Sequence, residues 1–66
     1  MSVAKTIELS AISPSSFEDA IREAITKSGE SLRNIQGAWV KEQKVVIENG
    51  EIAGFQAMIA LTFVVE

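Results

Sequence analysis

Residues 44–56 read KVVIENGEIAGFQ, and this stretch decides the fold of the chain. Its centre, Asn49-Gly50, is the strongest short-range signal for a two-residue hairpin turn, because both residues tolerate the positive φ angles of a type I′ turn. The flanking segments are rich in β-branched residues, which favour strands. They predict a hairpin of two long strands, residues 35–48 and 51–65, whose register only a bulge would shift.

The segments before the hairpin predict one strand and one helix. From residue 3 to residue 12 the apolar residues recur at period two, as in a strand with one buried face. Pro14 and the surrounding serines interrupt this strand, and residues 15–18, SSFE, match the spacing of a helix capping box, with Asp19 as a second acid in the first turn. A helical stripe of apolar positions begins at Phe17, and the predicted helix ends between residues 29 and 34.

In this register the two faces of the hairpin differ in composition. The face expected against the helix carries Ala38, Val40, Phe55, Ala57, Ile59, Leu61 and Phe63. The other face carries Trp39, Lys41, Gln43, Val45, Ile47, Ile52, Gln56, Met58, Ala60 and Thr62, with Gln43 directly opposite Gln56. The predicted fold class is α+β: a β-α-β-β unit with a three-stranded antiparallel sheet and one helix packed on one face. Residues 1–66 are expected to form a single domain.

The predicted hairpin is longer than the helix that covers it. Strands of about 12–14 residues span roughly 40 Å, whereas a helix of about 17 residues reaches only about 26 Å. The face without the helix carries five large apolar residues: Trp39, Val45, Ile47, Ile52 and Met58. So much apolar surface is unusual for a monomer, so we expect self-association, or contact with a ligand or another protein.

Composition excludes several classes of protein. The 66 residues are 47% apolar, with a mean hydropathy of +0.21, which excludes a disordered tail. Cysteine and histidine are absent, which excludes disulfides, zinc fingers and catalysis by thiolate or imidazole. Among the usual means of stabilising a small domain, this leaves oligomerisation.

Charge and hydropathy also bear on partners and location. The net charge of −3 argues against a nucleic-acid partner, which normally meets a basic face. The longest apolar stretch, residues 57–65, is much shorter than the roughly 20 residues of a membrane-spanning helix. The first ten residues lack the pattern of a signal peptide. We therefore expect no membrane partner and a soluble, cytoplasmic protein.

The segments SFEDAIREAI, residues 16–25, and SLRNIQGAWVKEQKVVIENGEIAGFQ, residues 31–56, resemble the dodecins. The order, spacing and total length agree over nearly the whole chain, and the most specific parts are FEDAI, ENG and Phe55-Gln56. Dodecins are small bacterial and archaeal β-α-β-β proteins that assemble as hollow shells of twelve subunits and commonly bind flavins. The resemblance implies a homododecamer that holds a small ligand, with riboflavin or flavin mononucleotide (FMN) as the typical one.

The resemblance also implies a site, from which this sequence departs. In flavin-binding dodecins a tryptophan early in the second strand stacks on the flavin ring, and a glutamine in the third strand hydrogen-bonds the ring's polar edge. The glutamine matches Gln56, but Gly37 occupies the tryptophan position. Trp39 lies on the same face, displaced by about 6.5 Å along the strand.

Two further family patterns bear on the choice of ligand. Dodecins that take phosphorylated flavin tend to carry a basic residue closely followed by histidine in the second strand, and here Lys44 is followed by valines. A related branch lacks the tryptophan and binds calcium. The resemblance therefore also implies a divalent cation as the alternative ligand.

The predicted ligand site consists of Trp39, Gln56, Gln43 and Gly37. Trp39 is either a stacking platform or an aromatic anchor at a subunit interface. The two glutamines either form hydrogen bonds to the edge of a flavin ring or form a hydrogen-bonded pair with each other. Gly37 either leaves room for a ligand or for a side chain of a neighbouring subunit, or is a bulge or close-approach position in the strand.

No catalytic residue and no metal ligand are predicted with this site. The serines have no histidine with which to form a triad. Glu48 and Glu51 face each other across the turn and either share a hard cation, splay into solvent or meet lysines of a neighbour. The first hypothesis is a non-enzymatic, dodecin-like homo-oligomeric shell that stores or sequesters a flavin. The second is a structural or calcium-type cation-binding assembly that binds no flavin.

Overall fold

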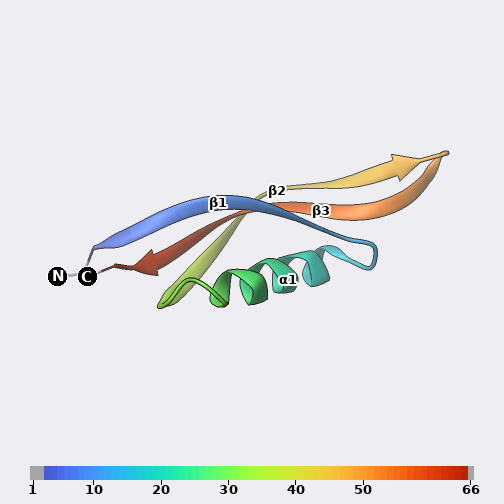
Figure 1. The fold of residues 1–66 in the computed structure, drawn as a ribbon. Helices are drawn as coiled ribbons and strands as arrows, with labels where there is room; N and C mark the ends of the chain where they lie inside the picture. The colour runs from blue at the N-terminus through green and yellow to red at the C-terminus, as the bar shows by residue number, and fades with distance from the viewer. Residues whose placement is uncertain (1–2, 66) are drawn as a thin grey trace.

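The computed structural model describes residues 3–65 of the chain. Its elements are β1 (Ala4–Ser13), α1 (Phe17–Gly29), β2 (Ile35–Glu48) and β3 (Glu51–Val64). β3 lies between β1 and β2 and pairs antiparallel with both, and α1 crosses one face of the sheet (Figure 1). The predicted α+β fold with one helix on a three-stranded antiparallel sheet is confirmed. The helix within the described residues is not long and apolar enough to cross a membrane.

The hairpin of β2 and β3 closes through the predicted turn. Asn49 has a φ angle of 53° and Gly50 one of 77°, so both residues adopt the left-handed region that a type I′ turn requires. Glycine and asparagine enter this region at lower cost than other residues. Glu48 consequently lies opposite Glu51, as predicted.

Three bulges shift the register of this hairpin, and two of them lie between Trp39 and the turn. Ala53 is an extra residue in β3 close to the turn, and Lys41 is an extra residue in β2 further along. Between the bulges the pairing is offset by one residue, so Gln43 lies opposite Ala57. The predicted pairing of Gln43 with Gln56 is therefore wrong.

The bulges also exchange the faces of the residues near the turn. Val45 lies opposite Phe55, and the Phe55 ring meets the Phe17 ring of α1 edge to face, with ring centroids 5.2 Å apart. Because side chains alternate along β2, Ile47 shares the face of Val45, together with its cross-strand partner Ile52. We call this side of the sheet the helix face and the other side the open face. The sequence analysis placed Gln43, Val45, Ile47 and Ile52 on the open face, and for these four residues it is wrong.

The core forms where α1 packs over β1 and β3. Ala20 and Ala24 of the helix are buried against three buried residues of β3: Ala57, Ile59 and Leu61. Alanines let the helix approach the sheet closely, which leaves the two large β3 side chains fully enclosed. Burying a side chain of that size stabilises the fold by about 1.5–3 kcal/mol. A chain of this size therefore depends on a very small set of core contacts.

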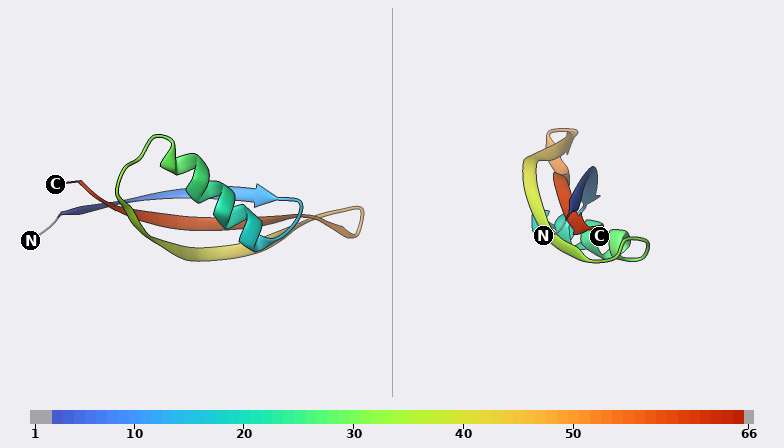
Figure 2. Two further views of the ribbon diagram at one scale, coloured as in Figure 1. Left: turned by 90° about the horizontal axis from the view of Figure 1, so that it is seen from below. Right: turned by 90° about the vertical axis from the view of Figure 1, so that its left-hand side faces the viewer.

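The hairpin extends past its helix. The chain measures 50 × 20 × 13 Å, and the tip of β2 and β3 projects beyond α1 (Figures 1 and 2). The 13 residues of α1 span only about 20 Å at 1.5 Å per residue. The helix therefore leaves the helix face uncovered near the turn.

Ser13 organises the connection from β1 to α1. Its buried hydroxyl donates a hydrogen bond to the Asp19 carboxylate (2.8 Å) and accepts one from the Ser15 backbone N–H (2.9 Å). Ser16 is the N-cap of α1, and its hydroxyl accepts a hydrogen bond from the Asp19 backbone N–H (3.0 Å). These contacts fix the angle at which the helix leaves the strand and crosses the sheet.

We expect Ser13→Ala to lower the free energy of unfolding by about 0.5–1.5 kcal/mol, because it removes the hydrogen bonds of the Ser13 hydroxyl to Asp19 and Ser15. Ser15→Ala is the matched control, since it removes an exposed hydroxyl two residues away. Urea denaturation followed by circular dichroism measures both. Equal stability of the two variants would contradict the role assigned to Ser13.

Candidate ligand-binding site

The predicted site residue Trp39 lies on the open face. It pairs with Ala60 of β3, which pairs in turn with Glu8 of β1, so the three residues form one row across the sheet. The Trp39 side chain is 67% exposed. An indole with this exposure presents a large planar apolar surface to a ligand or to another subunit.

A lysine lies over this indole. The Lys41 Nζ is 5.7 Å from the centre of the Trp39 ring, within the range of a cation–π interaction. The same ammonium forms an ion pair with the Glu8 carboxylate at 2.6 Å. Glu8 therefore holds the Lys41 charge above the ring of Trp39.

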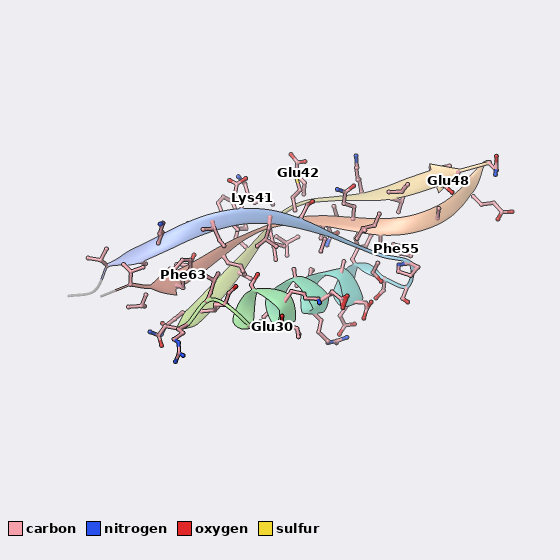
Figure 3. All side chains as sticks on the ribbon, viewed as in Figure 1. Glu30, Lys41, Glu42, Glu48, Phe55 and Phe63 are labelled. Carbon is pink, nitrogen blue, oxygen red and sulfur yellow. The ribbon has the colours of Figure 1, made fainter. Side chains whose placement is uncertain are left out.

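The bulge in β2 produces this arrangement. Because Lys41 is the extra residue, it and Glu42 both project from the open face, away from the helix (Figure 3). The sequence analysis did not single out Glu8, because no local pattern shows which residue of a distant strand aligns with Trp39. The pairing of β1 with β3 supplies that alignment.

Gln56 occupies a second part of the open face. It is half-buried and lies opposite Lys44, and both residues border a small hollow. The hollow has a volume of about 90 Å³ and is lined by Glu42, Gln43, Lys44, Gln56 and Met58. An amide, an ammonium and a carboxylate surround a thioether there, so the hollow offers donors and acceptors beside an apolar surface. Its volume is far below the roughly 300–1,000 Å³ of typical small-molecule sites.

Gln43 and Gln56 thus line the same hollow although they are not cross-strand partners. The register assigns Gln43 to the helix face, opposite Ala57. The two amides were predicted to project side by side, and this geometry is wrong because of the bulge at Lys41. The structure does place both residues at one depression.

Gly37 lies at the far end of the same face, opposite Thr62. A bulge at Gln36 precedes it, in agreement with the interpretation of this glycine as part of an irregular strand. A Cβ atom at Gly37 would meet nothing within 4 Å, and its φ angle lies outside the left-handed region. Neither the backbone nor the packing of one chain requires glycine here.

A single chain does not bring the four residues together. Trp39 lies opposite Ala60 of β3, and Ala60 is four residues from Gln56 along the same strand. Trp39 and Gln56 are therefore about 13 Å apart along the sheet. Gly37 and Gln56 are six positions apart, or about 20 Å, measured through Thr62. One chain therefore offers two separate half-sites on the open face.

The acidic pair at the hairpin tip stands apart from both half-sites. Glu48 and Glu51 are exposed cross-strand partners. Within residues 3–65 no group of three or more acidic side chains is placed to hold a metal ion. The pair alone offers two carboxylates, fewer than the six to eight oxygen ligands of Ca²⁺.

Comparison with protein families gives a match over almost the whole chain. The family model of the dodecins matches residues 3–66. The chain belongs to the dodecin family. No protein of curated function matches this dodecin.

Solved structures of other dodecins share its fold. Dodecin from Streptomyces coelicolor is 28% identical, with a TM-score of 0.93 over 98% of this chain and 93% of that one. A variant of Thermus thermophilus dodecin is 27% identical, with a TM-score of 0.93 over 100% of this chain and 98% of that one. The calcium dodecin from Mycobacterium tuberculosis, a calcium-chelating antigen, is 28% identical, with a TM-score of 0.87 over 98% of this chain and 93% of that one.

Quenching of the single tryptophan tests the placement of Lys41. A unit charge 5.7 Å from the ring changes the local free energy of an anion by about 0.7 kcal/mol in water, or about threefold in concentration. At low salt we therefore expect Lys41→Met to reduce iodide quenching of Trp39 by up to about threefold, and Glu8→Gln to increase it. Acrylamide, which is neutral, serves as the reference quencher. A change in the same direction in both variants would contradict the arrangement.

Proposed function

We propose that this dodecin is a non-enzymatic, homo-oligomeric protein of the cytoplasm that holds a small planar ligand, with riboflavin or FMN as the first candidate. The observation that carries the proposal is the exposed Trp39 indole on the open face, with the Lys41 ammonium 5.7 Å from the centre of its ring. An aromatic platform with few other apolar neighbours suits stacking, which requires no bond to be made or broken. The family membership supports a binding protein over an enzyme.

The ligand would contact the two half-sites in different ways. Trp39 supplies the stacking surface, and Gln56 with Lys44 supplies an amide and an ammonium for polar atoms at the ring's edge. Since one chain separates these groups by about 13 Å, a compact site takes them from two copies of the chain. The proposed function therefore includes self-association. Twelve is the family-typical number of subunits.

A second candidate function is a calcium-type or structural assembly without flavin. Gly37, in place of the family's stacking tryptophan, favours it, as does the similarity to the calcium dodecin from Mycobacterium tuberculosis. In this case Trp39 packs against a neighbouring subunit, and Glu48 and Glu51 of several copies supply the oxygen ligands.

Flavin titration distinguishes the two functions. We expect riboflavin and FMN to lose fluorescence when they bind at micromolar concentration, because stacking on an indole quenches the flavin. Trp39→Ala is expected to weaken binding at least tenfold, and Gln56→Ala about threefold to tenfold, since it removes hydrogen bonds only. Lys27→Ala, an exposed change in the last turn of α1, is the control that leaves binding unchanged.

Unchanged flavin fluorescence would contradict the first function. The same protein is then titrated with CaCl2 by isothermal titration calorimetry, with MgCl2 as the reference ion. Heat from Ca²⁺ binding that disappears in the Glu48→Gln/Glu51→Gln variant would establish the second function. Trp39→Ala would in that case weaken assembly.

Restoring the family aromatic gives a separate prediction. Gly37→Trp is sterically open in one chain, because a Cβ there contacts nothing within 4 Å. We expect this variant to bind riboflavin about tenfold more tightly than the natural chain, since a second ring adds stacking surface of about 1–2 kcal/mol. Gly37→Ala is the control, because it adds a side chain without a ring. Equal affinity of both variants would show that the position does not contact the ligand.

A further inference from the structure

Two large side chains flank a small one in the row that contains Trp39. The row runs from Trp39 of β2 through Ala60 of β3 to Glu8 of β1, and β3 lies between the other two strands. Neighbouring strands are about 4.8 Å apart, so Trp39 and Glu8 leave the sheet about 10 Å from each other. Between them Ala60 contributes only a methyl group. Another side chain is needed to cover that methyl group.

Lys41 covers Ala60. No helix lies on the open face, yet Ala60 is only 3% exposed, and it is not part of the core cluster under α1. The Lys41 ammonium is 2.6 Å from the Glu8 carboxylate and 5.7 Å from the centre of the Trp39 ring, so the lysine side chain crosses the row from β2 to β1. That side chain is 35% exposed, as expected when the methylene groups lie along the sheet and only the charged end reaches water.

The ammonium occupies the ring face that a ligand over this row needs. Because it lies over the Trp39 ring and also contacts Glu8, it covers the face turned toward β1. The opposite face is turned toward the outer edge of the sheet, since β2 is an edge strand. The atoms of a stacked ligand lie about 3.5–4 Å from the indole, closer than the ammonium does. A planar ligand between Trp39 and Glu8 therefore separates Lys41 from both.

The displaced ammonium remains beside the ligand. Lys41 is the bulge residue between two paired positions, Val40 with Ile59 and Glu42 with Met58, so its backbone is held in place on both sides. Its ion pair with Glu8 is largely exposed, and such pairs exchange partners easily because water screens them. The edge of the bound ring is then the nearest group that can replace the carboxylate.

We propose that Lys41 selects the ligand of this dodecin by charge. A planar ring that stacks on Trp39 replaces Glu8 as the partner of the Lys41 ammonium, so the site accepts rings whose edge carries a negative charge or carbonyl oxygens and rejects planar cations. Glu8 holds the ammonium at the ring while no ligand is bound. The inference rests on Trp39 as the platform of the proposed function and adds the chemical class of ligand that this platform takes.

Three probes with the same ring system and different charges test the selection: pyrenecarboxylate, pyrenemethanol and pyrenemethylammonium. Equilibrium dialysis against the full-length chain at low salt gives the Kd of each probe from its own absorbance. A unit charge at 5.7 Å changes an affinity by about threefold in water. We therefore expect the carboxylate to bind about threefold more tightly than the alcohol, and the ammonium about threefold more weakly. At about 1 M salt, where the Debye length is only about 3 Å, these differences are expected to disappear.

Four variants assign the preference to Lys41. Lys41→Met is expected to invert the order of the probes, because the carboxylates of Glu8 and Glu42 remain on the open face. Glu8→Gln is expected to widen the preference for the carboxylate. Lys27→Met is the matched control, since it removes the same charge from α1 on the other side of the sheet and is expected to keep the natural order. Trp39→Leu is expected to weaken binding of all three probes, and circular dichroism verifies that each variant is folded.

The outcomes separate this inference from the proposed function. Absence of binding by all three probes overturns the platform on which both rest. Equal affinity for the three probes, or an unchanged order in Lys41→Met, overturns the inference alone. An inverted order in the Lys27→Met control, or a charge preference that persists in Trp39→Leu, also overturns it, because the selection then belongs to another surface.

Discussion

Two of the three bulges in the hairpin, at Lys41 of β2 and Ala53 of β3, determine which side chains share a face between Trp39 and the turn. A shift of one residue moves a strand's side chains to the other side of the sheet. Ala53 shifts the register in β3, and Lys41 shifts it back from β2, so Trp39 remains opposite Ala60. Only the segment between the bulges and the turn is exchanged. The apolar residues of that segment thereby move to the helix face, and Lys41 reaches the indole of Trp39.

The sequence was sufficient for the elements, their order and the turn, because these follow from local patterns. Asn49-Gly50 specifies its own backbone, and the stripe from Phe17 specifies a helix face. The bulges were not predictable in the same way, since Ala53 and Lys41 carry no residue-level signal for an extra position. The position of Trp39 on the open face was accordingly predictable, and the predicted pairing of Gln43 with Gln56 was wrong. The Glu8 contact depends on the alignment of three strands and lies beyond any local pattern.

The exchange of faces gives the two sides of the sheet different chemistry. The open face combines one exposed aromatic ring with an ion pair, two further charged residues and a half-buried amide. The helix face near the tip is aliphatic and ends in an acidic turn. Aliphatic surface without polar groups suits a permanent protein contact, whereas mixed aromatic and polar surface suits a ligand that must be oriented. The apolar residues are thus divided between two faces of different chemistry.

The size of the half-sites links binding to assembly. A small-molecule site normally buries most of its ligand, and a hollow of about 90 Å³ beside a one-sided platform does not enclose a flavin. In the proposed function the remaining cover comes from another copy of the chain, so the ligand would bind the assembled form in preference to the single subunit. Such a ligand stabilises the assembly by mass action, by about 2.7 kcal/mol at a hundredfold excess over its Kd. The free energy of unfolding of a small domain is only about 5–15 kcal/mol, and this chain has few buried core residues. The contribution from the ligand is therefore a large part of the stability of one subunit.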